Sequence, residues 1–87
     1  MASIEQVKAA LIQATEQGDV VVGQIRSSLE QTEQTLVRLR AVAAGTGHPA
    51  LTEAIGRAEQ SRQRLGEALH LIQGSSDAAR NYIGVLG

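Results

Sequence analysis

The chain has no cysteine, phenylalanine or tryptophan, and its 87 residues include only one tyrosine and one proline. Without cysteine, the protein can form no disulfide, no thiolate metal site and no thiol nucleophile. The eight basic and nine acidic residues give a net charge of −1, which disfavours a nucleic-acid-binding face with its usual basic excess. The apolar runs are only a few residues long, far short of the roughly 20 residues that cross a bilayer.

The N-terminus also lacks a recognisable targeting pattern. It has no basic region followed by an apolar block, which is the pattern of a Sec signal peptide. We therefore expect a cytoplasmic protein, with export by a non-Sec route left open. The length suits one domain that spans residues 1–87.

One cluster of turn-forming residues divides the chain near its middle. Two glycines and the proline lie within the segment Gly45-Thr46-Gly47-His48-Pro49, which is a strong turn signal. Residues that favour helices dominate both sides. The sequence therefore predicts an all-α fold, a long antiparallel hairpin with helices over residues 3–44 and 49–85 and a turn at 45–48. Residues 74–77, Gly-Ser-Ser-Asp, could break the second helix.

The ends of both helices carry capping signals. Ser3 and Gln6 have the spacing of a capping box, and Pro49 suits the first turn of the second helix. We expect Gly45 to follow the first helix in the left-handed conformation.

Apolar residues recur in each half with alternating spacings of three and four, the heptad pattern of packed helices. In the second half, only Arg62 and Ser76 interrupt this row. In the first half, the row passes through Ala14 and Val21 and then shifts at Ile25, which predicts a four-residue stutter and nearly straight packing. We expect the core seam to contain Leu11, Val21, Ile25, Leu29, Leu36, Leu39, Leu51, Ile55, Leu65, Leu69, Ile72 and Ile83.

Further apolar residues lie beside the seams, among them Val20, Val37, Leu71 and Val85. They widen the apolar stripe beyond the seam of a two-helix coiled coil. A chain this small, without disulfides, rarely buries enough apolar area to be stable alone. We therefore expect two hairpins to pair into an antiparallel four-helix bundle as a two-fold homodimer, or one hairpin to pack on another helical protein.

No set of residues in the sequence predicts catalysis. His48 lies in the turn, where it is expected to help end one helix and begin the next, and His70 lies about 33 Å further along a straight helix. The sequence has no carboxylate dyad, no nucleophile–base arrangement and no phosphate-binding glycine loop. We expect a protein that is not an enzyme, with no catalytic, cofactor-binding or metal site and with neither nucleic acid nor membrane as partner.

Arg62 is the one charged residue in the predicted seam of the second helix. Folding the chain at about residue 47 places it opposite Thr32 and Glu33. One interpretation is a polar pair, with Glu33 or Glu30, that sets the register of the two helices. The other is a long side chain that extends from the edge of the bundle into water.

Three segments carry a resemblance to a group of small actinobacterial proteins of about this length. They are Met1-Ala2-Ser3-Ile4-Glu5-Gln6-Val7-Lys8-Ala9-Ala10-Leu11, Gly45-Thr46-Gly47-His48-Pro49 and Arg62-Gln63-Arg64-Leu65-Gly66-Glu67-Ala68. Those proteins are similar to helical-hairpin modules associated with polymorphic toxins and type VII secretion systems, and the chain resembles WXG-type hairpins in size and architecture. It lacks the Trp-X-Gly turn, and Leu86 rather than an acid lies four residues after Tyr82. The resemblance implies a hairpin fold and carries over no functional residue.

Three functions are compatible with these features. The first is a non-enzymatic hairpin that self-associates as an interaction module, such as an adaptor or chaperone-like partner of a secreted effector or toxin. The alternative is a WXG-like, secretion-associated protein that forms an obligate heterodimer with another hairpin. The third is a small regulatory or DNA-associated protein, which the charge balance disfavours.

Overall fold

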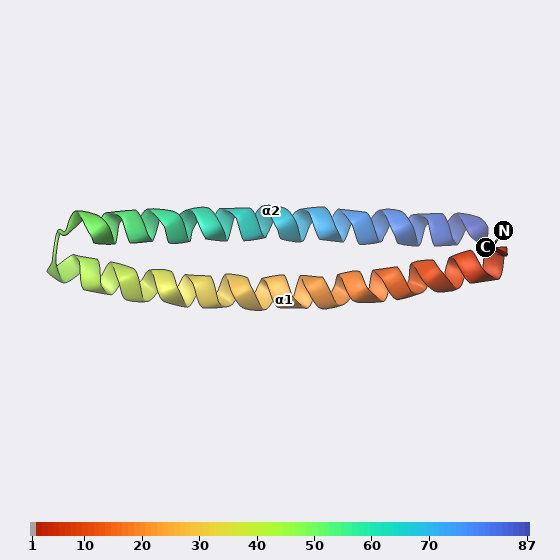
Figure 1. Ribbon diagram of the computed structural model, residues 1–87, viewed down its shortest axis with the longest axis horizontal. Coiled ribbons are helices and arrows are strands. Elements are labelled where there is room, and N and C mark those ends of the chain that lie inside the picture. Colours follow the sequence, from red (N-terminus) through yellow and green to blue (C-terminus); the bar gives the residue numbers. More distant parts are fainter. Residues whose placement is uncertain (1) are drawn as a thin grey trace.

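The computed structural model describes residues 2–87 and consists of two long antiparallel helices that lie side by side (Figure 1). Helix α1 spans Ile4–Gly45 and helix α2 spans Pro49–Leu86. Both termini lie at the end opposite the turn. The predicted all-α helical hairpin is confirmed.

The helix boundaries agree with the predicted ones to within one residue, and α2 continues through residues 74–77 without a break. Ser76, in the middle of this segment, is buried. It packs directly against Gly18 of α1. Packing across the seam therefore holds this glycine- and serine-rich segment in the helix, despite its weak helix propensity.

The two N-terminal caps satisfy backbone groups that would otherwise lack partners. The Ser3 hydroxyl accepts a hydrogen bond from the Gln6 backbone N–H at 3.2 Å, and the Gln6 side chain accepts one from the Ser3 N–H at 2.9 Å. At the start of α2, Nδ1 of His48 accepts a hydrogen bond from the Ala50 N–H at 3.1 Å. The capping box is thus present, and His48 caps α2 directly before Pro49.

The prediction of a left-handed Gly45 is wrong. Gly45 is the last residue of α1, and Thr46 follows it in an extended conformation with φ −156° and ψ 135°. The Thr46 N–H closes the helix by donating to the Ala43 carbonyl at 3.2 Å. Because the extended Thr46 already turns the chain away from the helix axis, no left-handed residue is needed there.

The seam of α2 follows the predicted heptad row over its whole length. Every residue of that row is buried or half-buried, Arg62 included. The row consists of Leu51, Ile55, Ala58, Arg62, Leu65, Leu69, Ile72, Ser76, Ala79, Ile83 and Leu86.

The seam of α1 differs from the prediction, because it contains no stutter. Ala14 and Val21 are exposed, and their neighbours Thr15 and Val22 turn toward α2 instead. The buried or half-buried row is Lys8, Leu11, Thr15, Gly18, Val22, Ile25, Leu29, Thr32, Leu36, Leu39 and Ala43.

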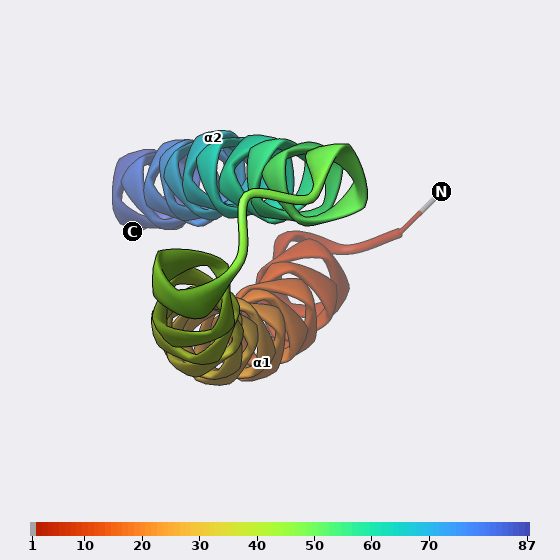
Figure 2. The same cartoon turned by 90° about the vertical axis from the view of Figure 1, so that its left-hand side faces the viewer.

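The reason for the continuous row is that α2 presents an unbroken heptad row, and an antiparallel partner must follow the same period to stay in contact. The cost is a polar Thr15 in the seam, and its hydroxyl is satisfied by donating to the Ile12 carbonyl at 2.8 Å. An unbroken heptad repeat makes helices supercoil. Figure 2 accordingly shows α1 and α2 winding around each other rather than running straight.

The hairpin buries very little. Leu36 is the one hydrophobic side chain among the described residues that is fully buried. The accessible surface is 6268 Å², whereas a compact monomer of 9.2 kDa exposes about 4,900 Å². The additional accessible surface follows from the elongated shape of the hairpin, which measures 63 × 18 × 14 Å.

Truncating the buried leucine tests how much the seam contributes. We expect Leu36→Ala to lower the free energy of unfolding by about 2–5 kcal/mol, because it removes buried methyl groups and leaves a cavity. The neighbouring Val37 is 62% exposed, so Val37→Ala should change it by no more than about 0.5 kcal/mol. Urea denaturation followed by circular dichroism measures both. Equal effects of the two changes would contradict this description of the core.

Candidate functional site

All ion pairs between the two helices lie on one side of the seam. We name this side the charged flank and define it by the residues that directly follow alternate seam residues. On α1 these are Ile12, Asp19, Arg26, Glu33 and Arg40, and on α2 they are Thr52, Glu59, Gly66, Gln73 and Arg80.

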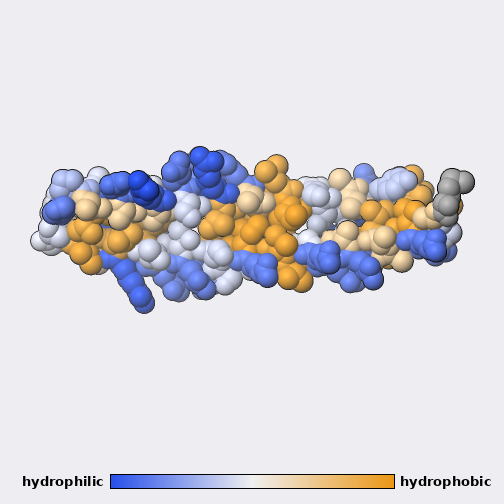
Figure 3. Space-filling model, in the orientation of Figure 1, coloured by the Kyte–Doolittle hydropathy of each residue, from blue (hydrophilic) through white to orange (hydrophobic). Residues whose placement is uncertain are grey.

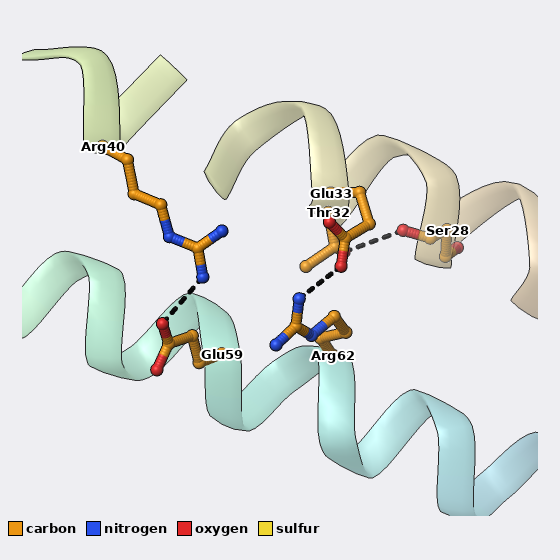
Figure 4. A network of polar contacts seen from close by, with 6 residues as sticks. All are labelled: Ser28, Thr32, Glu33, Arg40, Glu59 and Arg62. Carbon is orange, nitrogen blue, oxygen red and sulfur yellow. Dashed lines mark hydrogen bonds and ion pairs between the residues drawn. The ribbon is translucent and has the colours of Figure 1, made fainter. Parts of the chain in front are cut away.

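Three pairs cross between the helices on the charged flank. Arg80 donates to both oxygens of Asp19, at 2.7 and 2.8 Å. Arg40 donates to Glu59 at 2.9 Å, and Arg62 reaches out of the seam to Glu33 (Figure 4). Because the three pairs are spread over residues 19–40 of α1 and 59–80 of α2, they match one register of the antiparallel helices over these segments.

The carboxylates raise the pKa of two of these arginines above the ordinary value. The hydrogen bond and charge of Glu33 act on the pKa of Arg62, and those of Asp19 act on the pKa of Arg80. An arginine side chain is protonated at any pH at which proteins fold. These exposed pairs therefore respond to salt concentration rather than to loss of the arginine charge.

On the opposite side of the seam, the row of residues next to it carries no charge. We name it the uncharged flank and define it by the residues that directly precede the other alternate seam residues. On α1 these are Val7, Ala14, Val21, Ser28, Thr35 and Val42. On α2 they are Ala54, Ser61, Ala68, Ser75 and Tyr82.

A second row, which we name the outer row, lies next to the uncharged flank and farther from the seam; each of its residues follows a flank residue by three positions. The residues of the outer row differ between the two halves of the hairpin. In the half next to the turn this outer row holds Arg38, Arg57 and Arg64. In the open half, which comprises residues 4–22 and 71–86, it holds Ala10 and Gln17 on α1 and Leu71, Ala78 and Val85 on α2. None of the nine acidic residues lies in either row of this side.

Figure 3 views the hairpin from the side of the uncharged flank. Apolar residues gather in the middle, toward the end opposite the turn and also near the turn, and hydrophilic residues line both edges of the turn half and the α1 edge of the open half. Several of the large side chains here are open to solvent. Leu71 is 72% exposed, Val85 is 78% exposed and Tyr82 is 50% exposed. A face of this kind suits contact with another apolar surface.

The two helices lie in direct contact where Gly18 meets Ser76. A Cβ atom added to Gly18 would lie within 3.0 Å of the Ser76 hydroxyl oxygen. Beside this contact, on the uncharged flank, lies a shallow groove of about 270 Å³ whose walls include Ala14, Val21 and Ser75. The small residues at this point therefore permit close helix packing and leave a hollow on the apolar face.

Most of the residues predicted for the seam lie where the two helices meet. Of that set, Leu36 is buried and all others except Val21 are half-buried. Val21 is 37% exposed and belongs to the uncharged flank, because the continuous row places Val22 against α2. The structure also brings Arg62 to Glu33 and not to Glu30.

Sequence reasoning missed the difference between the two flanks. The signal was present, since Asp19, Arg26, Glu33 and Arg40 recur every seven residues and Ala14, Val21, Ser28 and Thr35 recur with the same period. Using it required the correct seam in α1, and the predicted stutter assigned residues 14 and 21 to the seam itself. Glu59 and Arg62 lie three residues apart in α2 but do not pair with each other, because each pairs across to α1 instead.

Residues 2–87 contain no group of three or more histidine, cysteine, aspartate or glutamate side chains arranged to hold a metal ion. Within the same residues, neither helix has a stretch both long and apolar enough to cross a bilayer.

Comparisons with protein families, with curated proteins and with solved structures found no match to this chain. The uncharged flank is therefore the candidate functional surface on physical grounds alone.

The close contact can be tested with alanine substitutions of two glycines. Gly23 has open space around it, so Gly23→Ala should stabilise the helix by about 1 kcal/mol. Gly18→Ala should gain clearly less, because the new methyl group must displace the Ser76 hydroxyl. In a Ser76→Ala background this difference should disappear. A double-mutant cycle by urea denaturation measures it, and an equal gain from both glycines in the wild-type background would contradict the contact.

Proposed function

We propose that the protein is a non-enzymatic helical-hairpin interaction module that self-associates through its uncharged flank. The observation that carries the proposal is the combination of exposed apolar side chains with a lack of charge in both rows of the open half. Isolated apolar residues on a surface are ordinary, but a continuous apolar face marks an interaction site.

The small buried core supports the same proposal. One fully buried hydrophobic side chain is little for a chain of 87 residues without disulfides. A second helical surface over the uncharged flank and its outer row would cover Leu71, Tyr82 and Val85 and would add the buried area that the hairpin lacks. A second copy is the simplest source of such a surface, since most self-associating proteins form closed two-fold dimers.

The charged flank does not suit this contact. Its charges already pair across the hairpin, and covering them would remove water from Asp19, Glu33 and their arginine partners. The free energy lost when paired charges are removed from water often exceeds the free energy gained from their stronger attraction. The two flanks therefore differ in role, one joining α1 to α2 and the other facing a partner.

An adaptor or chaperone-like role for a secreted effector would use this same surface. In the alternative function, another hairpin would cover the uncharged flank in an obligate heterodimer. The behaviour of the isolated chain separates these functions. A homodimer supports the proposed self-association, whereas an unfolded or aggregating chain supports the heterodimer.

Matched substitutions on the two flanks test the proposal. Light scattering at several concentrations should give a mass of twice 9.2 kDa for the wild-type chain. Leu71→Glu should weaken the dimer at least tenfold, because it places a charge in the outer row, beside the uncharged flank. Val37→Glu, at a similarly exposed site outside that flank, should leave the dimer intact. A wild-type monomer at every concentration, or equal effects of both changes, would contradict the proposal.

A seam substitution separates folding from association. Leu65→Asp places a charge between α1 and α2 at a half-buried position. We expect it to abolish association and most of the helical circular dichroism signal. A variant that keeps its full helicity and the native mass would show that the core lies elsewhere.

A further inference from the structure

The two halves of the uncharged flank differ in a way that bears on how a second copy can dock, given the self-association proposed above. The open half has no charge in either row and carries the two most exposed large hydrophobic side chains, Val85 and Leu71, together with the exposed Tyr82. The turn half carries Arg38, Arg57 and Arg64 in its outer row. Of these, only Arg57 has an ion-pair partner among the described residues, Glu53 in its own helix.

Two full-length overlaps fit this distribution poorly. If the copies lie parallel, turn over turn, the arginines of one copy face the arginines of the other, and no acidic residue lies on that side to balance them. If they lie antiparallel over the full length, each open half covers the arginine-bearing half of the other copy. Arginine charges would then lie against Leu71 and Val85, where they lose water without gaining a carboxylate.

An overlap limited to the open halves avoids both costs. It covers the apolar side chains of each copy with those of the other, and it leaves the six arginines of the dimer in water. Half of the 63 Å length and a width of 18 Å offer roughly 1,000 Å² of buried surface in total, which is at the lower end of specific interfaces. Such a dimer would dissociate on dilution.

We propose that a second copy docks on the open half of the uncharged flank, antiparallel to the first, with the two-fold axis passing near Ala78. This arrangement makes a short four-helix bundle at the centre of the dimer. The two turn halves extend from it in opposite directions, with Arg38 and Arg64, which have no ion-pair partner among the described residues, left in water.

Single cysteines test this arrangement cleanly, because the chain has none of its own. A residue beside a two-fold axis lies near the same residue of the other copy. A disulfide between the two needs their Cα atoms within about 7 Å of each other. Ala78 is exposed, so Ala78→Cys leaves the seam unchanged. We expect Ala78→Cys to form a disulfide-linked dimer under mild oxidation, and Ala68→Cys and Ser61→Cys to remain unlinked on a denaturing gel.

Other linking patterns would overturn the arrangement. Preferential linking of Ala68→Cys would indicate antiparallel overlap over the full length, since Ala68 lies near the middle of the hairpin. A wild-type dimer in which Ala78→Cys does not link would show that the axis lies elsewhere. If the cysteine-free chain is a monomer at every concentration, the proposed self-association fails, and not merely this docking geometry.

Substitution of an arginine gives a second, independent measurement. In the proposed arrangement Arg64 stays outside the interface, so Arg64→Gln should leave the dissociation constant unchanged within about twofold. In a parallel overlap the same change would relieve repulsion and strengthen the dimer several-fold. Sedimentation equilibrium at low salt measures the constant, and a several-fold change in either direction would contradict the proposal.

Discussion

The structure depends on one contact, the continuous heptad seam between α1 and α2. Long helices of this kind are marginal in water unless a face is covered, and each helix here covers the other. The buried seam residues are mostly small or polar, namely Thr15, Gly18 and Ser76. Leu36 is the one fully buried hydrophobic residue among the described residues. Its continuity over both helices matters more than the size of any single side chain.

The position of this seam also determines what the two flanks do. With the row running through Thr15 and Val22, the residues that follow it carry the charges, and Asp19, Glu33 and Arg40 pair with α2. The residues of the uncharged flank carry none. A shift of the seam by one residue in the first half of α1 would remove this separation. The proposed division of labour, pairing within the hairpin on one side and contact with a partner on the other, therefore rests on the register.

Much of the hairpin could be predicted because its signals are local. The Ser3 capping box, the turn around Gly47 and the helix propensity of both halves each depend on residues close together in the chain. The opposition of Arg62 and Glu33 followed from simple folding about residue 47. The left-handed Gly45 failed because several backbone geometries can end a helix, and residue type favours one without requiring it.

The sequence by itself determined that the chain forms two helices, where they begin and end, and which row of α2 faces inward. Only the tertiary structure decided which row of α1 meets that seam. Local hydrophobicity favoured Ala14 and Val21, whereas the unbroken period of α2 selected Thr15 and Val22. The physical reason is that a helix in isolation has no preferred side among neighbouring apolar residues. The partner helix supplies the preference, and with it the location of the uncharged flank.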